Sequence, residues 1–144
     1  MFGRKHKIIS DINTLIGEGT VITGDIHFAG GLRVDGRICG SIMSANGKQH
    51  ALLVLSEQGV VEGKIKVPYI VVNGTVRGPI HCDESLELQP AAKISGDIFY
   101  KILKIHQGAV IEGKMVRTET SQPELITYVA PAGESKEQQE NTKE

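Results

Sequence analysis

The chain has 144 residues, with 16 Lys and Arg against 17 Asp and Glu and a formal net charge of −1. This balance argues against a nucleic-acid-binding protein, which would carry a basic stripe, and no apolar run approaches the roughly 18 residues that span a bilayer. All glycines except Gly3 and Gly133 lie between positions 17 and 113, a distribution unlike that of a helical bundle, because each interior glycine costs a helix about 1 kcal/mol. The composition predicts one all-β domain with flexible termini.

Three segments follow one another along the chain. Residues 1–13 are basic, residues 14–116 are balanced in charge, and residues 117–144 are acidic and contain Pro123 and Pro131. The last segment has too few apolar residues to offset the entropy of ordering its backbone. We predict a flexible N-terminal segment, a central β domain and a disordered acidic tail.

The first residues form a candidate membrane-binding segment. Met1 and Phe2 can enter the headgroup boundary of a bilayer. Arg4, Lys5 and Lys7 follow them, and each basic residue gains about 1 kcal/mol near an anionic leaflet. One copy binds marginally, whereas an array of copies binds strongly. An ordinary solvated basic terminus is the alternative.

A five-residue phrase, apolar-x-Gly-x-apolar, repeats through the central segment. Its six copies are Ile22–Ile26, Ile38–Ile42, Val61–Ile65, Val76–Ile80, Ile94–Ile98 and Ile111–Met115. Alternating phrases such as Leu53–Leu55 and Leu86–Leu88 lie between the copies, and the sequence from Ser44 to His50 reads as an inserted loop. Repeats of this kind indicate a solenoid in which each short strand is stabilised by the coils beside it.

The repeat predicts a parallel β-helix of about six triangular coils. Glycine permits a positive φ at the corners, and Ile, Val and Leu suit inward stacks. A left-handed hexapeptide helix is the rival, but the spacing from the alternating phrase to the glycine phrase varies. It is longer from Leu55 to Val61 than from Val34 to Ile38. We therefore favour right-handed winding, which parallel crossovers generally adopt.

The two ends of such a solenoid form the candidate assembly site, because an uncapped end presents unpaired strand edges above an apolar cross-section. Neither flank contains a helix long enough to serve as a lid. We predict end-to-end contacts, and Phe99, which alternation places on the outside, is a further candidate. The predicted contact residues are Leu15, Ile16, Ile22, Ile26 and Phe28 at the N-terminal end and Leu103, Ile105, Ile111 and Met115 at the C-terminal end.

No constellation of catalytic, cofactor or metal-binding residues emerges from the sequence. His27, His81 and His106 each follow an inward Ile, and the first two fall in coils too far apart to share a metal. Cys39 is expected to face outward and Cys82 inward, which makes a disulfide between them implausible. Two cysteines without paired spacing fit a reducing cytoplasm. No glycine-rich loop precedes a helix, as a nucleotide site requires.

The central segment resembles the bactofilins, bacterial cytoskeletal proteins. The resemblance runs from about Thr14 to Met115 and rests on Ile16–Thr20, Gly24–Ile26, Gly31–Ile38, Val72–Gly78 and Ile94–Ile98. It implies a right-handed β-helix that polymerises without nucleotide, through like ends. It also implies a membrane-associated scaffold at the inner face of the cytoplasmic membrane, which positions peptidoglycan-related or polar proteins in cell shape or polar organisation. An N-terminal peptide of the form Met-Phe plus basic residues is common in that family.

Three functions remain open on the sequence alone. The first is a cytoplasmic, membrane-associated, self-polymerising scaffold that uses no nucleotide and is not an enzyme. The second is a trimeric β-helical enzyme of the acyltransferase type, and the third is a soluble monomeric adaptor. Long thin fibres in negative stain would distinguish the first from discrete trimers or monomers.

Overall fold

A computed structural model describes residues 11–45 and 50–118 of the chain. Every regular element in these ranges is a β-strand. The strands are β1 (Ile12–Ile16), β2 (Val21–Thr23), β3 (Ile26–Phe28), β4 (Gly31–Val34), β5 (Arg37–Cys39), β6 (Ile42–Ser44), β7 (Leu52–Leu55), β8 (Val60–Glu62), β9 (Ile65–Val72), β10 (Thr75–Arg77), β11 (Ile80–Leu88), β12 (Lys93–Ser95), β13 (Ile98–Tyr100), β14 (Ile102–Ile105), β15 (Val110–Glu112) and β16 (Met115–Arg117).

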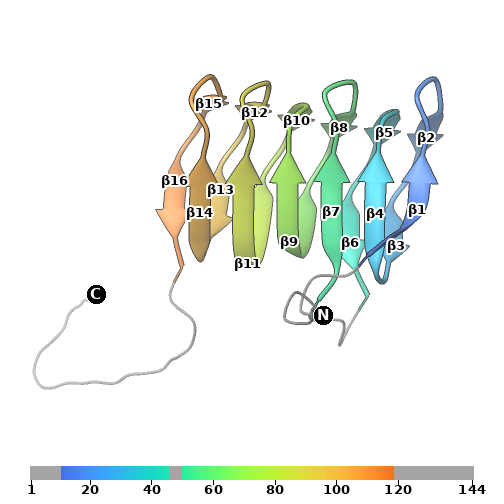
Figure 1. The fold of residues 1–144 in the computed structure, drawn as a ribbon, viewed down its shortest axis with the longest axis horizontal. Helices are drawn as coiled ribbons and strands as arrows, with labels where there is room; N and C mark the ends of the chain where they lie inside the picture. The colour runs from blue at the N-terminus through green and yellow to red at the C-terminus, as the bar shows by residue number, and fades with distance from the viewer. Residues whose placement is uncertain (1–10, 46–49, 119–144) are drawn as a thin grey trace, which may run out of the picture.

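The strands wind into a parallel solenoid with three faces (Figure 1). Face 1 contains β1, β4, β7, the second half of β9, the second half of β11, and β14. Face 2 is the 6-stranded sheet of β2, β5, β8, β10, β12 and β15. Face 3 contains β3, β6, the first halves of β9 and β11, β13 and β16. Because β9 and β11 bend around a corner, faces 1 and 3 join into one 10-stranded sheet.

The prediction of a right-handed solenoid of about six coils is confirmed. In Figure 1 the strands of face 1 run upward in front, the strands of face 3 run downward behind, and each coil advances from β1 toward β16. Each face receives one strand or half-strand from each coil, so the 6-stranded face 2 counts six coils. Coil 1 holds β1 to β3, and coil 6 holds β14 to β16.

The repeated glycine phrase forms the corner between faces 2 and 3. Its glycines have φ between 128° and 157°, a region that L side chains avoid. The coils also approach closely there, since a Cβ at Gly96 would lie 2.5 Å from the carbonyl oxygen of Gly78 in the coil before. The amide of each of these glycines except Gly113 donates to the next coil, as from Gly78 to the carbonyl of Ser95 at 2.9 Å. Glycine is therefore required at this corner by its backbone conformation and by the lack of room for a Cβ between the coils.

The core is a stack of aliphatic side chains along the axis of the solenoid. On face 2 the inward column is Ile22, Ile38, Val61, Val76, Ile94 and Ile111, in parallel register from coil to coil. Equivalent columns of Leu, Val and Ile run along faces 1 and 3. The strands are too short to be stable alone, and stacking these columns buries their apolar faces in one continuous interior.

Candidate functional site: the open ends of the solenoid

Burial along each inward column falls at the two ends. On face 2 the four central members, Ile38, Val61, Val76 and Ile94, are at most 1% exposed. Ile22 and Ile111, in coils 1 and 6, are only partly buried against the core. The side chains have the same type and direction, so the difference arises because the terminal ones lack a neighbouring coil. Each end of the described solenoid therefore presents an apolar cross-section.

The C-terminal end brings together the residues predicted to meet there. Leu103, Ile105, Ile111 and Met115 continue the inward columns of Leu86, Leu88, Ile94 and Ile98. Ile105 is 46% exposed, and the other three are partly buried. In the described part of the chain, β14, β15 and β16 each pair with one neighbour, so their outer edges carry unpaired backbone groups.

The N-terminal end is built in the same way, with one difference from the prediction. Ile16, Ile22, Ile26 and Phe28 point inward and lie against the core. Leu15 does not, because it is in register with Arg33 on the outer surface and is 60% exposed. Thr14 and Ile16 occupy the inward positions beside Leu32 and Val34. The register of β1 on β4 shifts between Ile12 and Thr14. Adjacent residues of a strand face opposite sides, so Leu15 and Ile16 cannot both line the end.

Phe99 lies on the outer surface of face 3, one coil in from the C-terminal end. Its ring stacks on His81 with centroids 4.7 Å apart and an interplanar angle of 12°, and the two residues are in register on β13 and β11. A contact through Phe99 would be lateral rather than end-on. Its role in assembly stays a prediction.

The histidines lie on different parts of the surface. His27 and His81 share the outer column of face 3 but are separated by Met43 and Lys66, and burial lowers the pKa of His81, assisted by the charges of Lys64 and Lys66. His106, expected to face solvent, is half-buried with Nε2 2.7 Å from Glu87 Oε2. Among residues 11–45 and 50–118, no group of three or more His, Cys, Asp or Glu side chains is placed to hold a metal ion.

The two cysteines occupy the predicted sides of the wall and are free thiols. Cys82 is 2% exposed on the inner side, and its Sγ donates to the carbonyl of Pro68 at 3.2 Å. Burial raises the pKa of the Cys82 thiol to about 12, so it is a core residue rather than a nucleophile.

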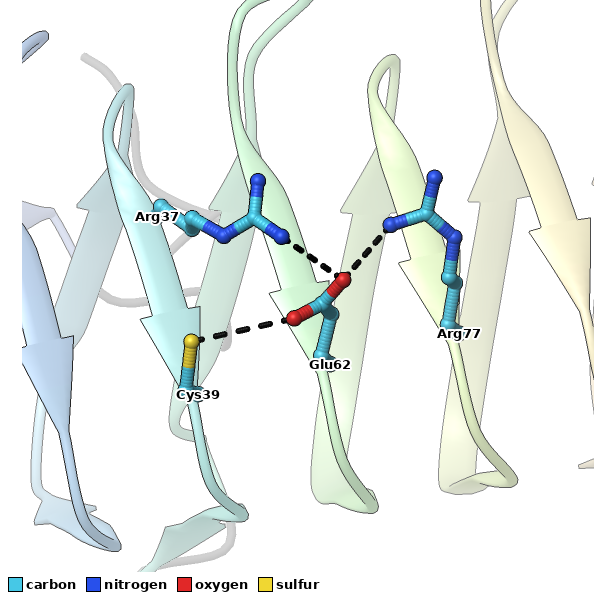
Figure 2. A network of polar contacts seen from close by, with 4 residues as sticks. All are labelled: Arg37, Cys39, Glu62 and Arg77. Carbon is cyan, nitrogen blue, oxygen red and sulfur yellow. Dashed lines mark hydrogen bonds and ion pairs between the residues drawn. The ribbon is translucent and has the colours of Figure 1, made fainter.

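On the outer surface of face 2, a cluster of ionic contacts joins three coils (Figure 2). Arg37 and Arg77 both donate to Glu62 Oε2, at 2.8 and 2.7 Å, and the Sγ of Cys39 lies 3.7 Å from Glu62 Oε1. Desolvation opposes ionisation of Glu62, but the hydrogen bonds and charges of Arg37 and Arg77 outweigh it and lower the pKa of this carboxyl. Local sequence patterns do not reveal this cluster, because its members come from three different repeats.

Outer face 1 carries a second feature that was not predicted from the sequence. Leu52 and Val54 of coil 3 lie beside Tyr69 and Val71 of coil 4, all on the outer surface and half-buried. The sequence signal was available, because Leu52–Leu55 and Tyr69–Val72 are uninterrupted apolar runs. Such runs are typical of strands covered on both faces.

Several predicted features lie outside the described residues. These are the membrane-binding candidates Met1, Phe2, Arg4, Lys5 and Lys7, part of the inserted loop, and the acidic tail from residue 119 onward. Within the ranges that the structure covers, no helix has the length and apolar character needed to cross a membrane.

The described residues form an all-β solenoid whose first and last coils present apolar cross-sections, which is the architecture of a stacking structural protein. Comparison with known families agrees, since a family model described as bactofilin, polymer-forming cytoskeletal, matches residues 14–116. The chain belongs to the bactofilin family. The resemblance found in the sequence is thereby confirmed, and the family is one of structural polymers.

Two curated relatives and one solved structure show how far the similarity extends. Bactofilins BacP and BacO of Myxococcus xanthus are each 30% identical over 103 residues, which is 72% of this chain. The match spans 41% of BacP and 78% of BacO, so it covers less than half the length of BacP. A bactofilin of Thermus thermophilus, reconstructed by cryo-EM as double helical filaments, matches with a TM-score of 0.54 and 26% identity. That alignment covers 74% of this chain and all of the Thermus chain.

Proposed function

We propose that this chain forms filaments by stacking its solenoids end to end, without a nucleotide, and serves as a cytoskeletal scaffold. The loss of burial along the inward columns at coils 1 and 6 carries this proposal. Stacking covers the exposed apolar cross-sections and pairs the free strand edges in the same step. Both changes favour association, because apolar surface leaves water and backbone groups gain partners.

The test places a charge in the C-terminal cross-section. Ile105→Arg inserts a guanidinium among Leu103, Ile111 and Met115, and we expect filaments to be replaced by short particles. The matched control is Val110→Arg, because Val110 is similarly exposed in the same coil but points away from the core. Negative-stain images and sedimentation provide the measurement.

The particle size in this test also reports which ends meet. If like ends meet, Ile105→Arg leaves the N-terminal ends intact and produces discrete dimers. If unlike ends meet, the variant is monomeric. Unchanged filaments of Ile105→Arg, or equal loss of filaments with Val110→Arg, would contradict end-to-end stacking through this cross-section.

We further propose that the filament is peripherally attached to the inner face of the cytoplasmic membrane. Met1 and Phe2 would enter the headgroup region, while Arg4, Lys5 and Lys7 contact anionic lipid. Many copies along a filament raise the effective concentration and turn marginal binding into stable binding. Positioning of cell-wall or polar proteins is the scaffold role that this arrangement would serve.

Deleting residues 1–7 tests membrane attachment separately from assembly. We expect the deletion to lower co-sedimentation with vesicles of anionic phospholipid and to leave filaments intact in negative stain. Neutral phosphatidylcholine vesicles are the control for the electrostatic part. Undiminished binding to anionic vesicles after the deletion would refute attachment through this segment.

A further inference from the structure

The outer surface of face 1 differs from the other two outer surfaces in carrying a contiguous apolar block. Leu52 and Val54 lie in register with Tyr69 and Val71 on the neighbouring coil, which makes a two-by-two patch at the middle of the solenoid. On outer face 2, the valines of the described strands are separated by Arg37, Thr75 and Lys93. On outer face 3 the central positions are Lys66 and His81, and the apolar neighbours Phe99 and Val116 form a single file at the C-terminal end rather than a two-by-two patch.

Along the solenoid axis, the coil before the block and the coil after it carry opposite charges on the same outer column. Arg33 precedes it in coil 2 and pairs with Asp35 at 2.9 Å. Glu87 follows it in coil 5 and contacts His106. Along the axis, the outer column of face 1 therefore reads Leu15, Arg33, Val54, Val71, Glu87 and Lys104.

We propose that this face binds a second copy of the chain, face to face, with the two solenoid axes antiparallel. A two-fold axis along the strand direction between coils 3 and 4 places coil 3 opposite coil 4 of the partner and coil 2 opposite coil 5. Val54 then meets the partner's Val71, and Leu52 meets the partner's Tyr69. Arg33 meets the partner's Glu87, so the charges on the two sides of the block become complementary.

In the outermost coils one outer column matches under the same operation, whereas in the other column Leu15 meets the partner's Lys104. Ile12 is 43% exposed and Ile102 is 58% exposed, and the two-fold axis brings them together because they end the same outer column. Gly31 meets the partner's Ser85, a pairing of small residues. A two-fold axis parallel to the solenoid axis would instead place each coil beside the same coil of the partner. Arg33 would then lie at the level of the partner's Arg33, and Glu87 at the level of the partner's Glu87, so like charges would repel.

The size of the surface predicts a weak contact for one pair of molecules. Six coils at about 4.8 Å and four residues at about 3.3 Å give a footprint of roughly 380 Å². A standard stable interface buries about 800 Å² on each partner. Lateral contacts of this size become effective when many are displayed in a row. The inferred role of face 1 is thus to pair solenoids laterally, independently of the ends.

The experiment introduces a charge into the block and uses a matched site on another face. Val54→Lys places an ammonium opposite the partner's Val71, where it would lose water without gaining a partner. Val60→Lys is the control, because Val60 is a half-buried outward valine of the same coil on face 2. We expect the fraction of laterally paired filaments in negative stain to fall about tenfold with Val54→Lys and to stay unchanged with Val60→Lys. Circular dichroism melting confirms that both variants fold.

A charge exchange tests the antiparallel register. Arg33→Glu should reduce pairing because it faces the partner's Glu87, and the double variant Arg33→Glu, Glu87→Arg should restore it. The exchange does not rebuild the contacts with Asp35 and His106 within the chain, so recovery identifies a contact between molecules.

Other occupants of the face give different results. If the face binds lipid, Val54→Lys lowers binding to anionic vesicles and leaves pairing unchanged. If residues 119–144 occupy it, Val54→Lys leaves pairing unchanged in the full chain. Either result, wild-type filaments that are all single, or equal loss of pairing with Val54→Lys and Val60→Lys, would overturn the proposal.

Discussion

The central and terminal coils are built from the same repeat and differ in what surrounds them. Ile94 and Ile111 are successive members of one inward column, with the same side chain and the same direction. Ile94 is 1% exposed and Ile111 is only partly buried, because Ile111 has a coil on one side alone. In a solenoid, the same aliphatic side chain therefore stabilises the fold when its coil is central and is available for assembly when its coil is terminal.

Truncating the two isoleucines measures this difference and has the largest expected effect. We expect Ile94→Ala to lower the free energy of unfolding by about 3–4 kcal/mol, and Ile111→Ala by about 1 kcal/mol in the unassembled chain. Urea denaturation below the concentration of assembly gives both values. Above that concentration the cost of Ile111→Ala should rise, since stacking buries the site. Equal costs in the unassembled chain would show that coil 6 is covered by another part of the protein.

The glycine corner offers a second matched pair. Gly24 in coil 1 has φ +128° and nothing within 4 Å of an added Cβ, whereas a Cβ at Gly96 would meet the backbone of Gly78. Gly24→Ala should cost about 1 kcal/mol for the backbone conformation, and Gly96→Ala about 2–3 kcal/mol because the coils must also separate. Thermal unfolding compares the two, and a cost for Gly24→Ala as large as that for Gly96→Ala would contradict the open end of coil 1.

The ionic cluster of the central coils gives the smallest predicted effect, which depends on pH. The pKa of Glu62 in the folded protein lies below its ordinary value of 4.5. Its ionised contacts therefore stabilise the fold above that pH, and the contribution is lost as the pH falls through the folded pKa. Glu62→Gln should be less stable than wild type at neutral pH, and the difference should shrink in acid. Denaturant unfolding at several pH values measures it, and a difference that persists unchanged in acid would remove the ionic explanation.

Much of the fold could be read from local patterns. The alternation of Leu53–Leu55 and Leu86–Leu88 fixed which side chains point inward, and the six glycine phrases located one corner of every coil. The inward placement of the last coil could be predicted for the same reason, since Leu103, Ile105, Ile111 and Met115 repeat the inward positions of earlier coils. At the N-terminal end the pattern was insufficient, because Ile12, Leu15 and Ile16 allow two registers and only the pairing with β4 selects one.

The sequence by itself determined the repeat, the inward columns and the need for glycine at the corners, because these depend on the period of a strand and on local backbone freedom. Only the tertiary structure decided how β1 is registered on β4, how Arg37, Glu62 and Arg77 converge, and that Leu52 and Val54 lie beside Tyr69 and Val71. Those outcomes depend on the number of residues in each corner, because this number sets where the chain returns to the same face. That number varies from coil to coil, so register between coils is a property of the whole stack.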